Sequence, residues 1–141
     1  MSKILINRTD SIFIAGHNGM VGKAINKAFL SKGYKNILKI EKSLLDLRDQ
    51  FKVNEWFKKN KPKIVIIAAA KVGGILANQK YPVEFLLDNL KIQNNIIESA
   101  WKYKSKRLLF LGSSCIYPKF ANQPIKEEYL MSNSLEPTNE S

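Results

Sequence analysis

The sequence is poor in the features of disulfide-bonded, secreted and membrane-spanning proteins. It has a single cysteine, Cys115, so no internal disulfide can form. No apolar run approaches the roughly 20 residues that a membrane-spanning helix needs, and the apolar part of the N-terminus is too short for a signal peptide. These absences predict a cytoplasmic protein without a membrane partner.

Acidic residues are also scarce, with 12 against 23 lysines and arginines, which gives a formal net charge of +11. Such a charge can attract an anionic partner, or it can simply be a solvated lysine surface. Only three of the basic residues are arginines, and the basic side chains are scattered along the chain. Because proteins that read nucleic acids favour arginine and stacked aromatic side chains, the composition predicts no nucleic-acid partner.

Glycine is rare as well, yet three of the seven glycines fall within one short stretch, residues 16–22. The apolar run 12–15 precedes this stretch and a helical pattern follows it, which is the strand–turn–helix context of a dinucleotide-binding site. Gly16 permits a tight turn, Gly19 lets the backbone approach a pyrophosphate, and Gly22 lets the helix pack on the strand. A ligand-free turn of the same shape is the alternative. The candidate cofactor contacts in this stretch are Gly16, His17, Asn18, Gly19, Met20, Val21 and Gly22.

Strand-like and helix-like segments alternate along the chain. The predicted strands cover 12–15, 36–40, 63–70 and 107–111, and the predicted helices cover 20–32, 48–60 and 82–103. This alternation predicts an α/β fold with a Rossmann-like, doubly wound parallel sheet. We expect one domain over residues 1–141, truncated after about four strands. In the strand order 3-2-1-4-5-6 the fourth strand then lies at an edge, and ligands bind outside the carboxyl ends of the strands.

Charged residues follow the second predicted strand, where the ribose of an adenine nucleotide is expected. Glu41 can hold a ribose 2′-hydroxyl and favour NAD, whereas Lys39 or Lys42 can hold a 2′-phosphate and favour NADP. A solvated charged turn is an equal alternative for each of them. Asp46 precedes the helix predicted from Arg48, so we interpret it first as the N-cap of that helix and second as a contact to adenine.

Small and nucleophilic side chains follow the third and fourth predicted strands. Residues 68–75, Ala-Ala-Ala-Lys-Val-Gly-Gly-Ile, let the backbone come close to a cofactor, or form a merely permissive loop. Residues 112–117 follow a strand expected to be buried and carry two hydroxyls and a thiol beside a tyrosine. Ser113 can hydrogen-bond a substrate carbonyl, and a partly deprotonated Cys115 can move a proton on a carbon beside it. A small buried hydrophobe is the simpler interpretation of Cys115.

Together these motifs resemble the extended short-chain dehydrogenase/reductases. The matching stretches are 16–22, 68–75, 108–118 (LLFLGSSCIYP) and 135–140 (LEPTNE). The resemblance is specific for members that use NADPH to epimerise and then reduce a GDP-linked 4-keto-6-deoxy sugar. It implies NADP in preference to NAD, and a GDP-sugar as the substrate.

The resemblance also implies roles for individual residues. Ser113 takes the position of the family's catalytic serine, and Cys115 takes that of its epimerisation acid/base. The further cofactor contacts that it implies are Lys42, Asp46, Leu47, Ala68, Ala69, Lys71, Leu111, Gly112, Ser113 and Ser114.

The family protonates the reduced carbonyl with a Tyr-x-x-x-Lys pair, and the 141 residues contain no such pair. We therefore expect the N-terminal, cofactor-binding part of such an enzyme, which does not turn over substrate alone. A non-catalytic dinucleotide-binding or interaction module is the alternative. The fourth strand, Arg-Leu-Leu-Phe-Leu, is an apolar edge without an interior charge, so we also expect self-association into homo-oligomers.

Overall fold

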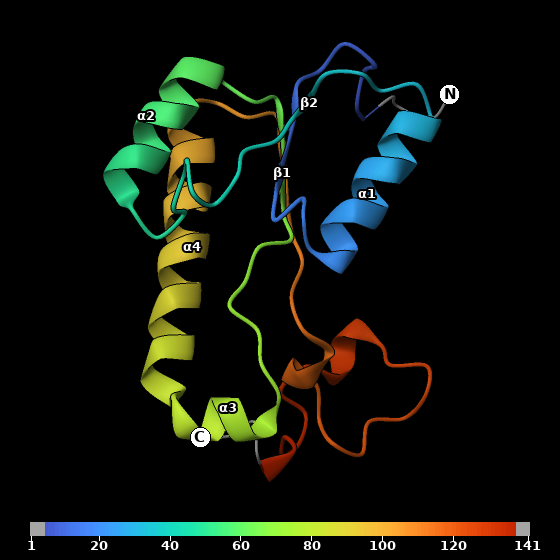
Figure 1. Ribbon diagram of the computed structural model, residues 1–141. Coiled ribbons are helices and arrows are strands. Elements are labelled where there is room, and N and C mark those ends of the chain that lie inside the picture. The colour runs from blue at the N-terminus through green and yellow to red at the C-terminus, as the bar shows by residue number, and fades with distance from the viewer. Residues whose placement is uncertain (1–4, 138–141) are drawn as a thin grey trace. The chain divides into compact units, whose positions relative to one another are not determined.

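Figure 1 shows the computed structural model of the chain, which describes residues 5–137. The chain divides into two compact units, one of Met1–Val72 with Phe85–Leu111 and the other of Gly73–Glu84 with Gly112–Ser141. The first unit holds the sheet, and its strands and helices alternate as the sequence predicted. Its elements are β1 (Ile12–Ala15), α1 (Met20–Ser31), β2 (Ile37–Leu38), α2 (Gln50–Asn60), β3 (Ile64–Ile67), most of α4 (Pro82–Lys102) and β4 (Arg107–Phe110).

The four strands form one parallel sheet in the order β2-β1-β3-β4. The predicted order, in which the third strand lies beyond the second, is wrong. Ile12 of β1 pairs with Ile37 of β2 on one side and with Ile64 of β3 on the other. After β2 the chain therefore crosses back over β1 and pairs β3 with its free edge, which satisfies the buried backbone groups of β1 on both sides. The winding of the sheet reverses between β1 and β3.

Helices cover both faces of this sheet: α1 packs on one face, and α2 and α4 pack on the other (Figure 1). Successive strand residues point to opposite faces, so both sets of positions have to be apolar. All residues of β1 and β3 are buried, as predicted for central parallel strands. The core toward α2 and α4 contains Phe13, Ala15, Val53, Phe57, Val65, Ile67, Ile96 and Ala100. The core toward α1 contains Ile12, Ile14, Ile64 and Ile66, against which Ile25 and Phe29 pack.

The helices begin and end close to their predicted positions, and the differences have local causes. α1 ends two residues before Gly33, the glycine expected at its C-terminus. α2 begins later than predicted, at Gln50, because Asp49 is its N-cap and accepts a hydrogen bond from the Lys52 N–H at 3.0 Å. The first interpretation of Asp46, as this N-cap, is therefore wrong.

β4 lies at an edge of the sheet, as the sequence predicted, but the expectation that it is buried is wrong. Leu109 keeps 52% of its surface exposed and Phe110 keeps 45%. The cause is the edge position itself, because within residues 5–137 β4 pairs only with β3. Its outer backbone groups therefore point away from the sheet, and its apolar side chains, which project from the two faces, are covered by neighbours only in part.

The second unit contains short helical turns that the sequence analysis did not predict. They are α3 (Ile75–Lys80), the 3₁₀ turn η1 (Ser114–Ile116) and the 3₁₀ turn η2 (Glu127–Tyr129). None of the helices in the described part of the chain combines the length and the apolar character that crossing a membrane requires.

Candidate functional site

A pocket of about 460 Å³ lies in the first unit, outside the carboxyl ends of β1, β2 and β3. It occupies the place where the winding of the sheet reverses, which is the common ligand position in open α/β sheets. Segments that are far apart in the sequence meet around it. The predicted site residues that line it are Gly16, His17, Asn18, Gly19, Lys42, Asp46, Leu47, Ala68, Ala69 and Lys71.

The turn between β1 and α1 needs glycine at two positions. Gly16 has a φ of +85°, and a Cβ there would lie 2.7 Å from the carbonyl oxygen of Ala68. At Gly22 a Cβ would lie 2.1 Å from the carbonyl oxygen of Gly16. The turn therefore packs directly on the loop after β3 and on the helix that follows. Met20, Val21 and Gly22 form the first turn of α1, whose N–H groups have no partner within the helix and suit an anion.

Glu41 ties the loop after β2 to the glycine turn. Nδ2 of Asn18 donates to Oε2 of Glu41 at 2.7 Å, and Nε2 of His17 lies 3.3 Å from Oε1. These hydrogen bonds, first that of Asn18, lower the pKa of Glu41, which is therefore a carboxylate at neutral pH. Glu41 and Lys42 both line the pocket. An acceptor for a ribose hydroxyl and a cation for a phosphate thus stand next to each other.

Asp46 faces Arg48 instead of capping α2. Nη2 of Arg48 donates to Oδ2 of Asp46 at 2.7 Å, and Nε donates to Oδ1 at 3.0 Å. This bidentate contact with the Arg48 guanidinium lowers the pKa of Asp46 to about 2. Asp46 is therefore a carboxylate fixed at the wall of the pocket by an arginine that the sequence analysis did not assign to the site.

The remaining predicted residues lie around the end of β4. Leu111 belongs to the first unit, whereas Gly112, Ser113, Ser114 and Cys115 belong to the second. Oγ of Ser113 accepts a hydrogen bond from the Cys115 N–H at 3.1 Å. A hydroxyl that accepts in this way can still donate its own proton, for example to a carbonyl oxygen. Cys115 is a free and exposed thiol, so its interpretation as a buried hydrophobe is wrong.

The pocket also contains side chains that the sequence analysis did not assign to it. Arg48 lies in the loop after β2, and Asp88 and Ile92 lie one turn apart on α4. Asp88 is one of several charged residues of α4, so nothing in the sequence distinguished it from the others. Among residues 5–137, no three histidine, cysteine or acidic side chains are grouped so that they could hold a metal ion.

Comparison with known proteins places these features in one family. The profile of the NAD dependent epimerase/dehydratase family matches residues 12–140. GDP-L-fucose synthase 1 of Arabidopsis thaliana is 52% identical over 134 residues, which is 95% of this chain and 42% of that protein. MlghC, a GDP-mannoheptose C4 reductase from Campylobacter jejuni with NADP bound, is 36% identical with a TM-score of 0.87, over 94% of this chain and 42% of that one. A GDP-L-fucose synthetase from Naegleria fowleri bound to NADP is 30% identical with a TM-score of 0.79, over 93% and 40% of the two chains.

This chain thus spans about 42% of the length of the plant relative. The family profile covers the glycine turn, the reversal of winding and all the loops that line the pocket. The resemblance that the motifs indicated is confirmed by these matches. The chain belongs to the NAD dependent epimerase/dehydratase family.

Proposed function

We propose that this chain is the cofactor-binding part of an NADP(H)-dependent GDP-L-fucose synthase. Such an enzyme epimerises GDP-4-keto-6-deoxymannose at two carbons and then reduces the 4-keto group. The observation that carries the proposal is the pocket outside the carboxyl ends of β1, β2 and β3, which is built from the glycine turn and the loops after β2 and β3. The substrate class comes from the relatives, which are named for GDP-L-fucose or for a GDP-linked heptose.

The residues around the pocket fit a dinucleotide that supplies a hydride when it is bound. Gly19 and the first turn of α1 offer backbone N–H groups to a pyrophosphate. Lys42 offers a cation to a 2′-phosphate, and Ala68 and Ala69 leave room for the backbone after β3 to approach the cofactor. Both solved relatives named above hold NADP, which supports NADP(H) in preference to NAD(H).

Ser113 and Cys115 act on the substrate in this proposal. The hydroxyl of Ser113, which accepts from the Cys115 N–H, donates a hydrogen bond to the 4-keto oxygen and orients it. The carbonyl makes the hydrogens on its neighbouring carbons acidic, so the exposed Cys115 side chain can remove or return such a proton.

Titration of NADPH into the chain, followed by nicotinamide fluorescence, tests the proposal. We expect saturable binding, and weaker binding by Gly19→Ala, because the added methyl group lies where a pyrophosphate approaches the backbone. The new Cβ would be 3.4 Å from its nearest neighbour, which is ordinary contact, so this variant keeps the fold. Gly74→Ala is the control, because its Cβ would meet nothing within 4 Å and Gly74 does not line the pocket. A folded chain that binds neither NADPH nor NADH contradicts the proposed function.

A further inference from the structure

Four charged side chains form a continuous network along one wall of the pocket. Nη2 of Arg48 donates to Oδ2 of Asp46 at 2.7 Å, and Nη1 donates to Oδ2 of Asp88 at 3.1 Å. Nζ of Lys71 donates to the same oxygen of Asp88 at 3.0 Å. The network therefore runs from Asp46 through Arg48 and Asp88 to Lys71, and all four residues line the pocket.

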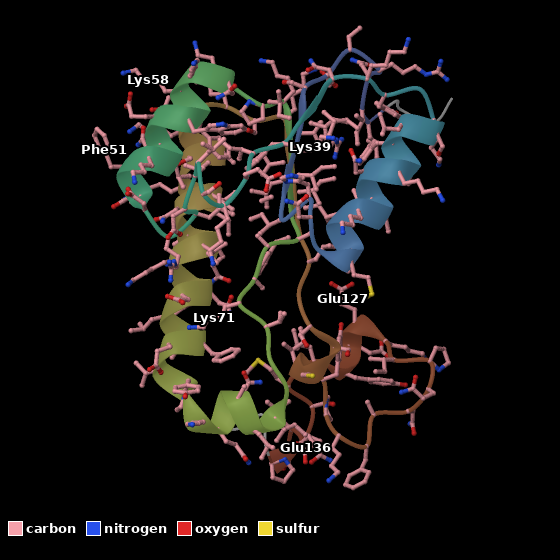
Figure 2. All side chains as sticks on the ribbon, in the orientation of Figure 1. Lys39, Phe51, Lys58, Lys71, Glu127 and Glu136 are labelled. Atoms are coloured by element: carbon pink, nitrogen blue, oxygen red, sulfur yellow. The ribbon has the colours of Figure 1, made fainter. Side chains whose placement is uncertain are left out.

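The network joins three elements that are distant in the sequence. Asp46 and Arg48 lie between β2 and α2, Asp88 lies on α4, and Lys71 lies on the loop after β3, where it points toward α4 (Figure 2). A second tie fixes the backbone of the same loop. Asn89 accepts from the Lys71 N–H at 2.7 Å and donates to the Lys71 carbonyl oxygen at 2.9 Å. The loop after β3 is thus held to α4 through both its side chain and its backbone.

The burial and the charge of Asp88 suit a residue that fixes the position of other side chains in the network. The side chain of Asp88 is only 17% exposed, and the hydrogen bond from Lys71, with Arg48 beside it, lowers the pKa of Asp88. Asp88 is therefore charged at neutral pH. Two carboxylates and two cations cancel, so the network adds no net charge that would draw an anionic cofactor into the pocket. It determines where Lys71 and Asp46 stand.

We propose that Asp88 and Arg48 are positioning residues of the cofactor site, which hold Lys71 and Asp46 at the pocket wall in the arrangement that a bound dinucleotide meets. Neither residue has to touch the cofactor. Side chains that are fixed before binding lose less conformational entropy when the ligand arrives, which increases affinity. The inference rests on the proposed function, because it takes the ligand of this pocket to be a dinucleotide.

The test compares NADPH binding by the 141-residue chain and its variants in one fluorescence titration. Asp88→Asn keeps the size of the side chain but removes the charge that holds Lys71, and we expect roughly tenfold weaker binding. Glu98→Gln is the matched control. Glu98 also lies on α4 and accepts a hydrogen bond from Gln50 at 3.1 Å, but it does not line the pocket, so its loss should leave affinity unchanged. Thermal unfolding of each variant shows whether it is folded.

A double variant separates positioning through Lys71 from a general structural effect. If Asp88 acts mainly through Lys71, then Asp88→Asn weakens NADPH binding less in a Lys71→Met chain than in the wild-type chain, because only its contact with Arg48 is left to lose. Losses that multiply instead overturn the proposal. If Asp88→Asn does not fold, Arg48→Gln replaces it, with an expected loss of roughly threefold.

The outcomes distinguish the two proposals. Unchanged NADPH affinity in folded Asp88→Asn, or in Arg48→Gln where that variant replaces it, overturns the positioning role and leaves the proposed function standing. A folded wild-type chain that binds no dinucleotide overturns both.

Discussion

Among single residues, Glu41 and Lys42 in the loop after β2 should have the clearest effect on the choice between NADP(H) and NAD(H). Glu41 is held as a carboxylate by Asn18 and His17, and a carboxylate in this place accepts from a ribose 2′-hydroxyl. Lys42 lines the same pocket and can neutralise a 2′-phosphate. The two side chains have opposite preferences, so the margin between the cofactors should be modest. We expect NADP(H) to be the favoured one, because both solved relatives hold NADP.

Charge changes at these positions should alter the preference in opposite directions. We expect Lys42→Glu to weaken NADPH binding roughly tenfold more than NADH binding, because it removes a charge-assisted contact. Glu41→Gln should strengthen NADPH binding. Lys39→Glu is the control, because Lys39, the other lysine considered for the 2′-phosphate, does not line the pocket and its substitution makes the same change of charge. Fluorescence titration with both cofactors measures the effects, and tenfold tighter NADH binding by the wild-type chain would contradict the expected preference.

Among the elements, α2 is attached to the sheet mainly through one face. Phe57 is fully buried, and its ring meets that of Phe13 edge-on with the centroids 5.7 Å apart. Phe51, on the same helix, is 76% exposed and projects outward (Figure 2). The two phenylalanines therefore form a matched pair for testing what holds α2.

Phe57→Ala should lower the free energy of unfolding by about 3–5 kcal/mol, because it removes a buried ring and leaves a cavity between α2 and the sheet. Phe51→Ala should change it by less than about 0.5 kcal/mol. Urea unfolding followed by circular dichroism measures both variants. Similar losses in the two would show that α2 is not held by its buried face.

A second link between elements lies at the amino ends of the strands. Nζ of Lys106, just before β4, donates to Oδ1 of Asp10, just before β1, at 2.6 Å. The Asn7 N–H donates to the other carboxylate oxygen at 2.9 Å. Asp10 is 7% exposed, and its hydrogen bond to Lys106, followed by that of Asn7, lowers its pKa.

This link should make the stability of the fold depend on pH. A carboxyl group with a lower pKa in the folded state stabilises the fold above its unfolded pKa, here 3.8, and this contribution is lost as the pH falls through the folded pKa. Asp10→Asn should therefore be less stable than wild type at pH 7, and its melting temperature should fall less between pH 5 and pH 2. The melting temperature of the variant should still fall somewhat with pH, because the pKa of Asp46 is lowered as well. If the melting temperatures of variant and wild type fall equally between pH 5 and pH 2, Asp10 does not have this role.

At the scale of the whole molecule, we expect the edge of β4, which within residues 5–137 pairs with β3 alone, to govern association. An exposed apolar strand is a template for pairing with another chain, and the net charge of +11 opposes this only weakly, because salt screens it beyond about 8 Å. We expect the chain to self-associate at micromolar concentration in 0.15 M salt, as measured by light scattering. Leu109→Lys should reduce association, whereas Leu30→Lys, at an equally exposed position on α1, should not. A wild-type chain that stays monomeric for days would contradict this.

The sequence by itself determined the features that depend on residues close together along the chain. Apolar runs predicted β1 and β3 as buried strands, because a central parallel strand needs apolar side chains on both faces. The glycine pattern predicted a tight turn at Gly16 and close packing of the helix on the strand at Gly22, and the structure shows that a Cβ fits at neither position. Together with the later motifs, this was enough to indicate the family.

The tertiary structure decided which distant segments meet. The pairing of β3 with β1, the contact of Arg48 with Asp88 and the position of Asp88 at the pocket wall all join segments that are far apart in the sequence. The local sequence pattern determines whether a segment forms a helix, a strand or a turn. Which segments lie next to each other in the fold is decided by backbone hydrogen bonds and packing across the whole chain.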